Sequence, residues 1–488
     1  MTLAASDSTT RPIDQAIMSA PASVLNEPLT PTGRIYLQKK INQVILGAVG
    51  VRDPIDVDRL RLTLPHSPMV NHPRFSSLVS RGIRGEDRWK GSLVNVDDHV
   101  IVLENPVSAD HDDEAAVNEY LAGLSDTCSD WPVSDRPLWE MHILVAHRCL
   151  VFRIHHSLGD GTSLIALLLA SCTREASIPL EELGPRVTAE RRTISKPNGW
   201  KDGAVRTMSD IWQRAAYIME LMARTTFLKD SRTIISGGNG VEMLPRKVAT
   251  ARFSMEDMHI VKFSEAGATI NDVLCTIISI GLFRYIKQRS PGDLKQGTKM
   301  TGIVVANVRE KRGLLELPEM LGGCPGTRWG NKVGYIFLPL DYRVNDFHDQ
   351  LGCLRRIKAT LDGKKAWSEA SFSSKLFESA VSYAGPKAVS IVKHRICCNT
   401  TFVISNIFGP MEELAVMGNP ITYIRMTSTG LPHALFMHMV SYAGRADMQV
   451  LAAKHIIPDP EFLAYCFEEA LVGLKQAAME TPSISSSQ

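Results

Sequence analysis

Two adjacent histidines are followed by an aspartate between two glycines in the segment HHSLGDG, residues 155–161. An ordinary histidine has a pKa of about 6.5, so it can take up and return a proton near neutral pH. The glycines allow tight backbone angles and a close approach of substrate around Asp160. Asp160 itself is short enough to brace the loop through an arginine or backbone amides. The segment therefore predicts acid–base chemistry, and the structural alternative is a loop whose histidine is simply satisfied in the core.

The two histidines stand at a junction between a strand, a loop and a helix. LWEMHILVAHRCLVFRIHH, residues 138–156, predicts two short strands with a turn near His147 and Arg148. Strand side chains alternate between faces, so His155 and His156 must point in opposite directions. One of them can reach a cleft, whereas the other must face the packed interior.

The helix after this loop is predicted over DGTSLIALLLASC, residues 160–172, with Thr162 or Ser163 near its N-cap. Two other kinds of site are disfavoured here. The histidines do not share a face and no further ligand cluster accompanies them, which argues against a metal site made with Asp160. The chain has no G-x-S-x-G elbow, which argues against Ser157 as a nucleophile.

Composition is that of a soluble or peripheral globular protein. The chain has 488 residues, 44% of them hydrophobic and 22% charged, with a formal net charge of +2. This balance gives no case for nucleic acid as a partner. Nine scattered cysteines without a C-x-x-C pair indicate a reducing compartment rather than a zinc site or a disulfide framework. We find no apolar run of the roughly 18 residues that a membrane span needs.

Strand and helix patterns are mixed in two halves, which predicts a mixed α/β fold. We expect a disordered N-terminus at 1–26 and a first half at 27–173, which carries HHSLGDG. A crossover linker rich in Pro, Gly, Ser and Arg is expected at 174–250, a second half at 251–478 and a disordered tail at 479–488. The active site is then expected between the halves.

The crossover contains an amphipathic helix in MSDIWQRAAYIMELMARTTF, residues 208–227. Apolar residues recur there at steps of three and four, namely Met208, Ile211, Trp212, Ala215, Met219 and Met222. We favour a helix packed on the second half over a helix lying on a membrane surface. Asp210 and Glu220 dilute the positive charge that a surface-bound helix usually carries.

Seven ordered motifs carry a resemblance to a known family. HHSLGDG matches the HHxxxDG signature of the acyltransferases related to chloramphenicol acetyltransferase, which include condensation domains and plant hydroxycinnamoyl-type transferases. The others are EPLTP (27–31), PLWE (137–140), INDVL (270–274), NVR (307–309), GNKVGYIFLPL (330–340) and SNIFGP (405–410). Together they resemble the plant branch of the bifunctional wax ester synthase/diacylglycerol acyltransferase family over about residues 27–475. Charged residues in the crossover, such as Arg214 and Glu220, depart from the more apolar segment of many plant members and argue against a span there.

The resemblance implies two chloramphenicol-acetyltransferase-like domains with a tunnel between them, and it assigns residue roles. His156 is the implied general base, His155 supports it, and Asp160 holds the loop by a salt bridge for which Arg309 is the candidate partner. The implied substrate-binding positions are Gly161, Asn271, Asn307, Arg309, Trp139, Ser405 and Asn406. Asn271 is equally well explained as a helix cap, and Trp139 as a core residue.

The implied reaction moves a long-chain acyl group from acyl-CoA to a fatty alcohol or to diacylglycerol. His156 would deprotonate the alcohol as it attacks the thioester, and the oxyanion would be held by Asn271 or by a backbone N–H near 159–161. No metal or redox cofactor is required, since acyl-CoA is a substrate. The products would serve cuticular wax or triacylglycerol synthesis. The expected location is the cytosolic face of the endoplasmic reticulum membrane, peripherally bound, or the plasma membrane.

Two competing functions remain open at this point. One is an HHxxxDG transferase acting on a phenolic or other small alcohol, although the D-F-G-W-G string of that group is absent. The other is a lipid-binding relative that has lost catalysis, against which the intact HHSLGDG segment argues. Turnover distinguishes them, because a binding protein releases no CoA.

Overall fold

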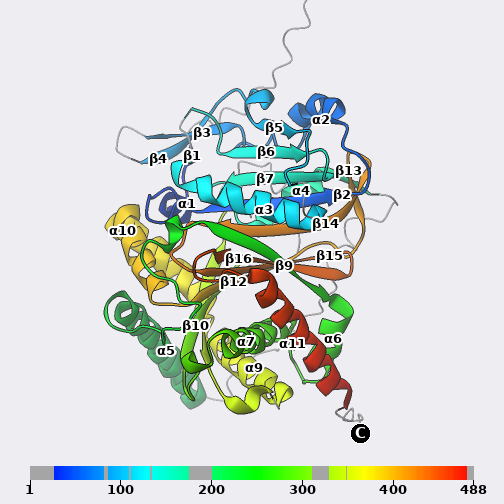
Figure 1. The fold of residues 1–488 in the computed structure, drawn as a ribbon. Coiled ribbons are helices and arrows are strands. Elements are labelled where there is room, and N and C mark those ends of the chain that lie inside the picture. The colour runs from blue at the N-terminus through cyan, green and yellow to red at the C-terminus, as the bar shows by residue number, and fades with distance from the viewer. Residues whose placement is uncertain are drawn as a thin grey trace, which may run out of the picture.

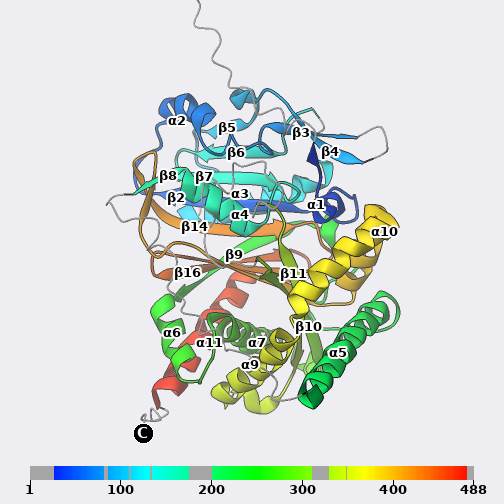
Figure 2. The same cartoon turned by 180° about the vertical axis from the view of Figure 1, so that it is seen from behind.

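Two mixed β-sheets lie one above the other, with helices around them (Figures 1 and 2). The computed structural model describes residues 27–81, 86–108, 112–131, 135–174, 200–309, 329–347 and 349–480. The N-terminus expected to be disordered at 1–26 lies outside the described residues, and so do residues 481–488 of the tail expected at 479–488 and most of the crossover before 200. The last helix runs to Glu480, two residues into the expected tail.

The first sheet has seven strands in the order β5-β6-β7-β2-β14-β13-β8. Their bounds are β2 Val44–Val51, β5 Val100–Leu103, β6 Trp139–Leu144, β7 Cys149–His155, β8 Cys172–Arg174, β13 Leu414–Val416 and β14 Asn419–Thr429. The predicted turn between β6 and β7 is confirmed, with Arg148 in the left-handed region at φ 49°. β2, with the sequence VILGAVGV, is buried along its whole length, which is why it reads as a continuous apolar run rather than an alternating one. A small sheet orders β1 Glu27–Pro28, β4 Asp87–Gly91 and β3 Ser77–Arg81 side by side.

The second sheet has six strands in the order β11-β10-β12-β15-β16-β9. Their bounds are β9 Arg246–Ser254, β10 Lys299–Asn307, β11 Val333–Asp341, β12 Phe402–Phe408, β15 Leu435–Tyr442 and β16 Arg445–Ala453. Strand alternation divides its side chains between two cores: Phe337 packs into the core shared with the first half, and its neighbours Ile336 and Leu338 pack into the core beneath helices.

Helices surround both sheets, and their bounds are α1 Pro31–Tyr36, α2 Val57–Thr63, α3 Asp113–Asp126, α4 Gly161–Ala170, α5 Trp200–Thr226, α6 Met255–Phe263, α7 Ile270–Arg289, α9 Gln350–Ala366, α10 Glu369–Cys398 and α11 Pro460–Glu480. In both views α7, α9 and α11 cover the second sheet on the side away from the first half. α5 lies at the outside of the second half, and it packs against α10. In the part of the chain that the structure describes, no helix combines the length and the apolar character needed to cross a bilayer.

The two sheets do not follow the division of the chain at 250. β9 runs through the expected boundary, so the second half of the structure begins at Arg246. β13 and β14, which come from the second half of the sequence, join the first sheet, where Ile424 of β14 is paired with Val49 of β2. β14 is not among the strands predicted from the sequence, and local patterns do not encode which sheet receives it.

Candidate active site

The HHSLGDG segment joins the end of β7 to the start of α4. The two histidines lie on opposite faces, as strand alternation predicts. His155 is fully buried, and its ring lies 5.9 Å from that of Trp131. His156 lines a cavity between the two halves, where its ring centroid lies 4.3 Å from that of Tyr36 in α1. Only His156 is therefore placed to meet a substrate.

His155 is held by a fixed set of hydrogen bonds in the interior. The amide of Asn42 donates to the carbonyls of Cys128 and Trp131 at 2.8 and 2.6 Å, so its Oδ1 must accept from His155 Nε2 at 3.3 Å. Nδ1 of His155 then accepts from the backbone N–H of Ser157. Burial lowers the pKa of His155 to about 3, which keeps it neutral. Its place is structural, at the base of the loop that carries His156.

His156 has the other tautomer, and Asn331 sets it. Nδ2 of Asn331 donates to the carbonyl of His156 at 2.8 Å, which leaves Oδ1 as the acceptor. His156 Nδ1 lies 2.9 Å from that oxygen and so carries the proton. Nε2 of His156 is left with a free lone pair, which is the form that a general base requires.

The charge state of His156 is set by its surroundings. Burial is the largest cause that lowers its pKa, to about 4, and the cation of Lys393 lowers it further, while Asp160 and Asn331 oppose the shift. Lys393 lines the same cavity, with Nζ 3.0 Å from the hydroxyl of Tyr335 and 4.8 Å from the centre of the Tyr36 ring. His156 is therefore neutral across the physiological pH range.

Replacing Lys393 by methionine is expected to raise the pKa of His156, because the variant removes a nearby positive charge. Only the neutral imidazole accepts a proton, so kcat/KM falls as the pH drops through this pKa. The acidic limb of a plot of kcat/KM against pH should therefore move to higher pH in the variant. Lys90→Met removes the same charge from an exposed position on β4 and serves as the control. An acidic limb that stays in place or moves to lower pH would contradict this assignment.

Asp160 and Arg309 form a buried ion pair 149 residues apart in the chain. Nη1 of Arg309 lies 2.8 Å from Oδ2 of Asp160, and Nη2 lies 3.0 Å from Oδ1. The backbone N–H of Lys332 also donates to Oδ2, at 2.9 Å. Nη2 of Arg309 donates to the carbonyl of Gly330 at 2.6 Å. This network fastens the histidine loop to the segment that carries Asn331.

Asp160, rather than Thr162 or Ser163, is the N-cap of α4. Its Oδ1 accepts from the N–H of Ser163 at 2.9 Å. The flanking glycines are needed for space and not for their backbone angles, since neither has a positive φ. A Cβ on Gly161 would come within 2.3 Å of Cδ1 of Ile407 in β12, so a larger residue there would have to displace the end of that side chain.

The cavity around His156 has a volume of about 100 Å³. Of the predicted binding residues, Gly161, Asn307, Ser405 and Asn406 line it. Asn307 also accepts from the backbone N–H of Arg309 at 2.9 Å. The side-chain amide of Asn406 donates to Oδ1 of Asn271 at 2.7 Å. Within the described residues, Oδ1 of Asn406 has no hydrogen-bond partner. That oxygen is available to a donor on a bound substrate.

Asn271 and Trp139 do not line the cavity. Asn271 lies behind Asn406 in the first turn of α7, and the cap of that helix is Thr269. Trp139 is a core residue whose Nε1 donates to the carbonyl of Phe75 at 2.9 Å. It supports Phe75, and Phe75 in turn lines a second cavity. The indole is therefore one layer behind the wall of that cavity.

Asn331, Lys393 and Tyr36 belong to the site, although the sequence did not single them out. Asn331 stands within the GNKVGYIFLPL string, so that motif held a usable signal. Tyr36 and Lys393 reach the cavity from α1 and α10, and their spacing from HHSLGDG reveals nothing of this.

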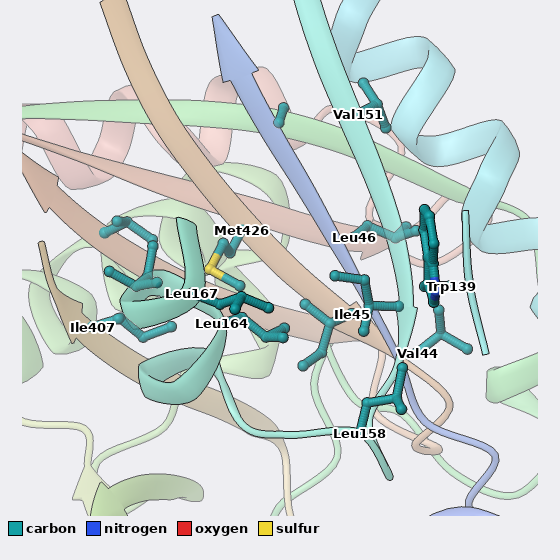
Figure 3. Close-up of a cluster of buried hydrophobic side chains, with 14 of the residues drawn as sticks. Val44, Ile45, Leu46, Trp139, Val151, Leu158, Leu164, Leu167, Ile407 and Met426 are labelled. Atoms are coloured by element: carbon teal, nitrogen blue, oxygen red, sulfur yellow. The ribbon is translucent and has the colours of Figure 1, made fainter. Parts of the chain in front are cut away.

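A second, apolar chamber of about 250 Å³ adjoins the cavity and shares Ile45 and Met426 with it. One face of β2 leads from one space to the other: Gln43, just before the strand, lines the cavity, Ile45 lines both, and Gly47 lines the chamber. Figure 3 shows Leu164 and Leu167 of α4 close to Met426 on this side of the sheet. The chamber can hold a hydrocarbon chain whose reacting end lies beside His156.

Together these groups can deprotonate a hydroxyl beside an apolar tail site. A neutral imidazole with a fixed tautomer supplies the base. The first turn of α4 supplies N–H groups at Gly161 and Thr162, both of which line the cavity, at the positive end of the helix dipole. This arrangement suits acyl transfer, in which an oxyanion develops.

Comparison with known proteins gives family matches along most of the chain. The wax ester synthase/diacylglycerol acyltransferase catalytic domain matches residues 133–274, and the WS/DGAT C-terminal domain matches residues 329–475. Wax ester synthase/diacylglycerol acyltransferase 11 of Arabidopsis thaliana is 31% identical over 95% of this chain and 97% of its own length. Wax ester synthase/diacylglycerol acyltransferase 5 of the same plant is 30% identical over 94% and 95%.

Two solved structures show the same fold at low sequence identity. The wax ester synthase/diacylglycerol acyltransferase from Marinobacter aquaeolei VT8 is 16% identical, with a TM-score of 0.57 over 93% of this chain and 100% of that one. The trichothecene 15-O-acetyltransferase from Fusarium sporotrichioides is 12% identical, with a TM-score of 0.57 over 96% and 100%. The predicted mixed α/β acyltransferase fold is confirmed.

Proposed function

Because this chain belongs to the wax ester synthase/diacylglycerol acyltransferase family, we propose that it transfers a long-chain acyl group from acyl-CoA to a long-chain fatty alcohol, to diacylglycerol, or to both. The observation that carries the proposal is the apolar chamber beside the His156 cavity, with Ile45 and Met426 lining both spaces. A small phenolic acceptor with a short acyl group would need no chamber of this kind.

The proposed transfer is direct, without an acyl-enzyme. Nε2 of His156 takes the proton from the acceptor hydroxyl as its oxygen bonds to the thioester carbon. The C–S bond then breaks, and the imidazolium returns the proton to the CoA thiolate. Binding both substrates in one enclosed site removes much of the entropic cost and keeps water from the thioester.

The oxyanion is proposed to be held by the N–H groups of Gly161 and Thr162 at the start of α4. Both residues line the cavity, and the first N–H groups of a helix have no partner within it. This choice replaces Asn271, which is separated from the cavity by Asn406.

Filling the chamber is expected to change chain-length preference. A Cβ on Gly47 meets its neighbours only at 3.7 to 3.9 Å, so a side chain fits there and points toward Met426 and Phe152. Gly47→Leu should lower the ratio of kcat/KM for palmitoyl chains to kcat/KM for octanoyl chains about tenfold, because the distal methylenes lose their apolar site. The ratio is measured separately for acyl-CoAs and for alcohols, which shows whose tail the chamber holds. Gly123→Leu on α3, where a Cβ meets nothing within 4 Å, is the control. An unchanged ratio for both substrates would exclude the chamber as a tail site.

We propose that the protein acts at the cytosolic face of a membrane of the endoplasmic reticulum. The eight cysteines that the structure describes are free thiols, which agrees with a reducing compartment. Fluorescence microscopy of the full chain with marker proteins tests this location.

The acceptor is tested by offering labelled palmitoyl-CoA with hexadecanol, with dipalmitoylglycerol or with a phenolic alcohol. We expect wax ester, triacylglycerol or both. Ester formation with the phenolic alcohol alone would support acyltransferase activity but would overturn the proposal that the acceptor is a lipid. Binding of substrate without CoA release would identify a non-catalytic relative.

A further inference from the structure

Helix α5 is turned so that its apolar stripe faces outward. Five large side chains are more than half exposed: Met208 at 72%, Ile211 at 61%, Trp212 at 69%, Met219 at 53% and Met222 at 65%. The helix does pack on the second half, as expected, but it does so through Tyr217 and Leu221 rather than through this stripe. Scattered exposed apolar residues are common on protein surfaces, but a continuous stripe along a helix marks a contact surface.

The opposite face of α5 is anchored through polar as well as apolar groups. Arg224, 5% exposed, bonds to Glu220 at 3.0 Å and Asp230 at 3.2 Å. Tyr217 packs against Phe337 with ring centroids 5.6 Å apart. These contacts hold the helix in this orientation and account for the outward position of the stripe.

The buried face of the same helix reaches the active site. Tyr217 and Leu221 line the cavity that contains His156. One helix thus separates the exposed apolar stripe from the reacting groups. In Figures 1 and 2 it lies at the outer edge of the molecule, with nothing described beyond it.

The exposed charge on this surface is mainly positive, although Asp210 is partly exposed. From 207 to 232 the exposed charged side chains are Arg214, Lys229 and Arg232. The acidic residues of the same stretch are less exposed, and Glu220 and Asp230 are paired with Arg224. A cationic rim beside exposed Trp, Ile and Met side chains complements a bilayer with anionic headgroups, where tryptophan favours the interface.

We propose that α5 docks on the surface of an anionic phospholipid bilayer and lies between that surface and the His156 cavity. This inference rests on the proposed function in one respect, namely that water-insoluble substrates reach the cavity from the bilayer. The docking itself needs only the stripe and its cationic rim.

The test uses the full chain with Trp212→Glu and Met219→Glu combined. Both side chains point away from the core, so folding should be preserved. Leu62→Glu with Leu93→Glu is the matched control, since these leucines are 75% and 72% exposed at other places. Vesicles of phosphatidylcholine, with and without one-third phosphatidylserine, are floated with each protein.

We expect the wild type and the control to float with the anionic vesicles, and the α5 variant to float about tenfold less. Acyl transfer to hexadecanol held in vesicles should fall by a similar factor, while transfer from octanoyl-CoA to a soluble short alcohol stays within about twofold. Equal flotation of both variants would overturn the docking while leaving the proposed function intact. Flotation that depends on α5 without any ester formation would support the docking and overturn the function. The proposal would also be overturned if the wild type did not float with vesicles and light scattering showed it to be a dimer but the α5 variant a monomer. That result would assign the stripe to contact with a second copy of the chain.

Discussion

Replacement of His156 by alanine is expected to lower kcat by about 10²–10⁴-fold, the usual contribution of a positioned general base. The residual rate would come from substrate binding and from the N–H groups at the start of α4. The side chain is only partly buried and its ring is replaced by cavity space, so the fold should persist. Initial rates at saturating acyl-CoA and alcohol measure the effect.

Asn331→Ala is the companion variant, because it acts through the tautomer of His156. Without the Oδ1 acceptor, nothing in the described site keeps the proton on Nδ1. We expect a smaller loss, in kcat rather than KM, of about 10²-fold. Activity of His156→Ala at the wild-type level would remove the base from the mechanism.

Replacement of Arg309 by methionine is expected to have the largest effect on stability. Its side chain is 2% exposed and that of Asp160 is 4% exposed, so the variant leaves a buried carboxylate without its cation. Breaking a buried pair from one side costs about 3–5 kcal/mol. Chemical denaturation measures the loss, and kcat should fall about 10²-fold, since the loop that carries His156 is no longer fixed.

Arg309→Lys should recover only part of the loss, because an ammonium cannot bond to both carboxylate oxygens as the guanidinium does. Arg52→Met removes an exposed partner of Glu413 and should leave the unfolding free energy unchanged. An Arg309→Met protein with wild-type stability and activity would show that the ion pair does not hold the loop.

The strands and the faces of the site could be predicted from the sequence because they depend on local rules. Alternation along β7 predicted that His155 and His156 face opposite ways, and the turn before this strand was located near His147 and Arg148. The family motifs, rather than alternation, assigned His156 to the cavity. The pairing of Asp160 with Arg309 came from the family motifs, since nothing local joins residues 149 positions apart.

Other features depend on which surfaces meet and could not be predicted from local patterns. The periodicity of α5 gave its apolar stripe correctly, but a helical pattern does not say whether the stripe faces a core or the outside. The contacts of Arg224 with Glu220 and Asp230 fix the orientation in which the stripe faces outward. In the same way, β14 was not among the predicted strands, and its pairing with the distant β2 depends on long-range contacts rather than on a local pattern.

The central claim is direct transfer with His156 as the base, and a single-turnover experiment tests it most directly. Enzyme in excess is mixed with labelled palmitoyl-CoA, with or without hexadecanol, and quenched over time. We predict that CoA and ester appear together in equal amounts only when the alcohol is present, that no label remains on the protein, and that His156→Ala slows both products equally. Label bound to the protein before the alcohol is added, or ester formed by His156→Ala at the wild-type rate, would contradict the account.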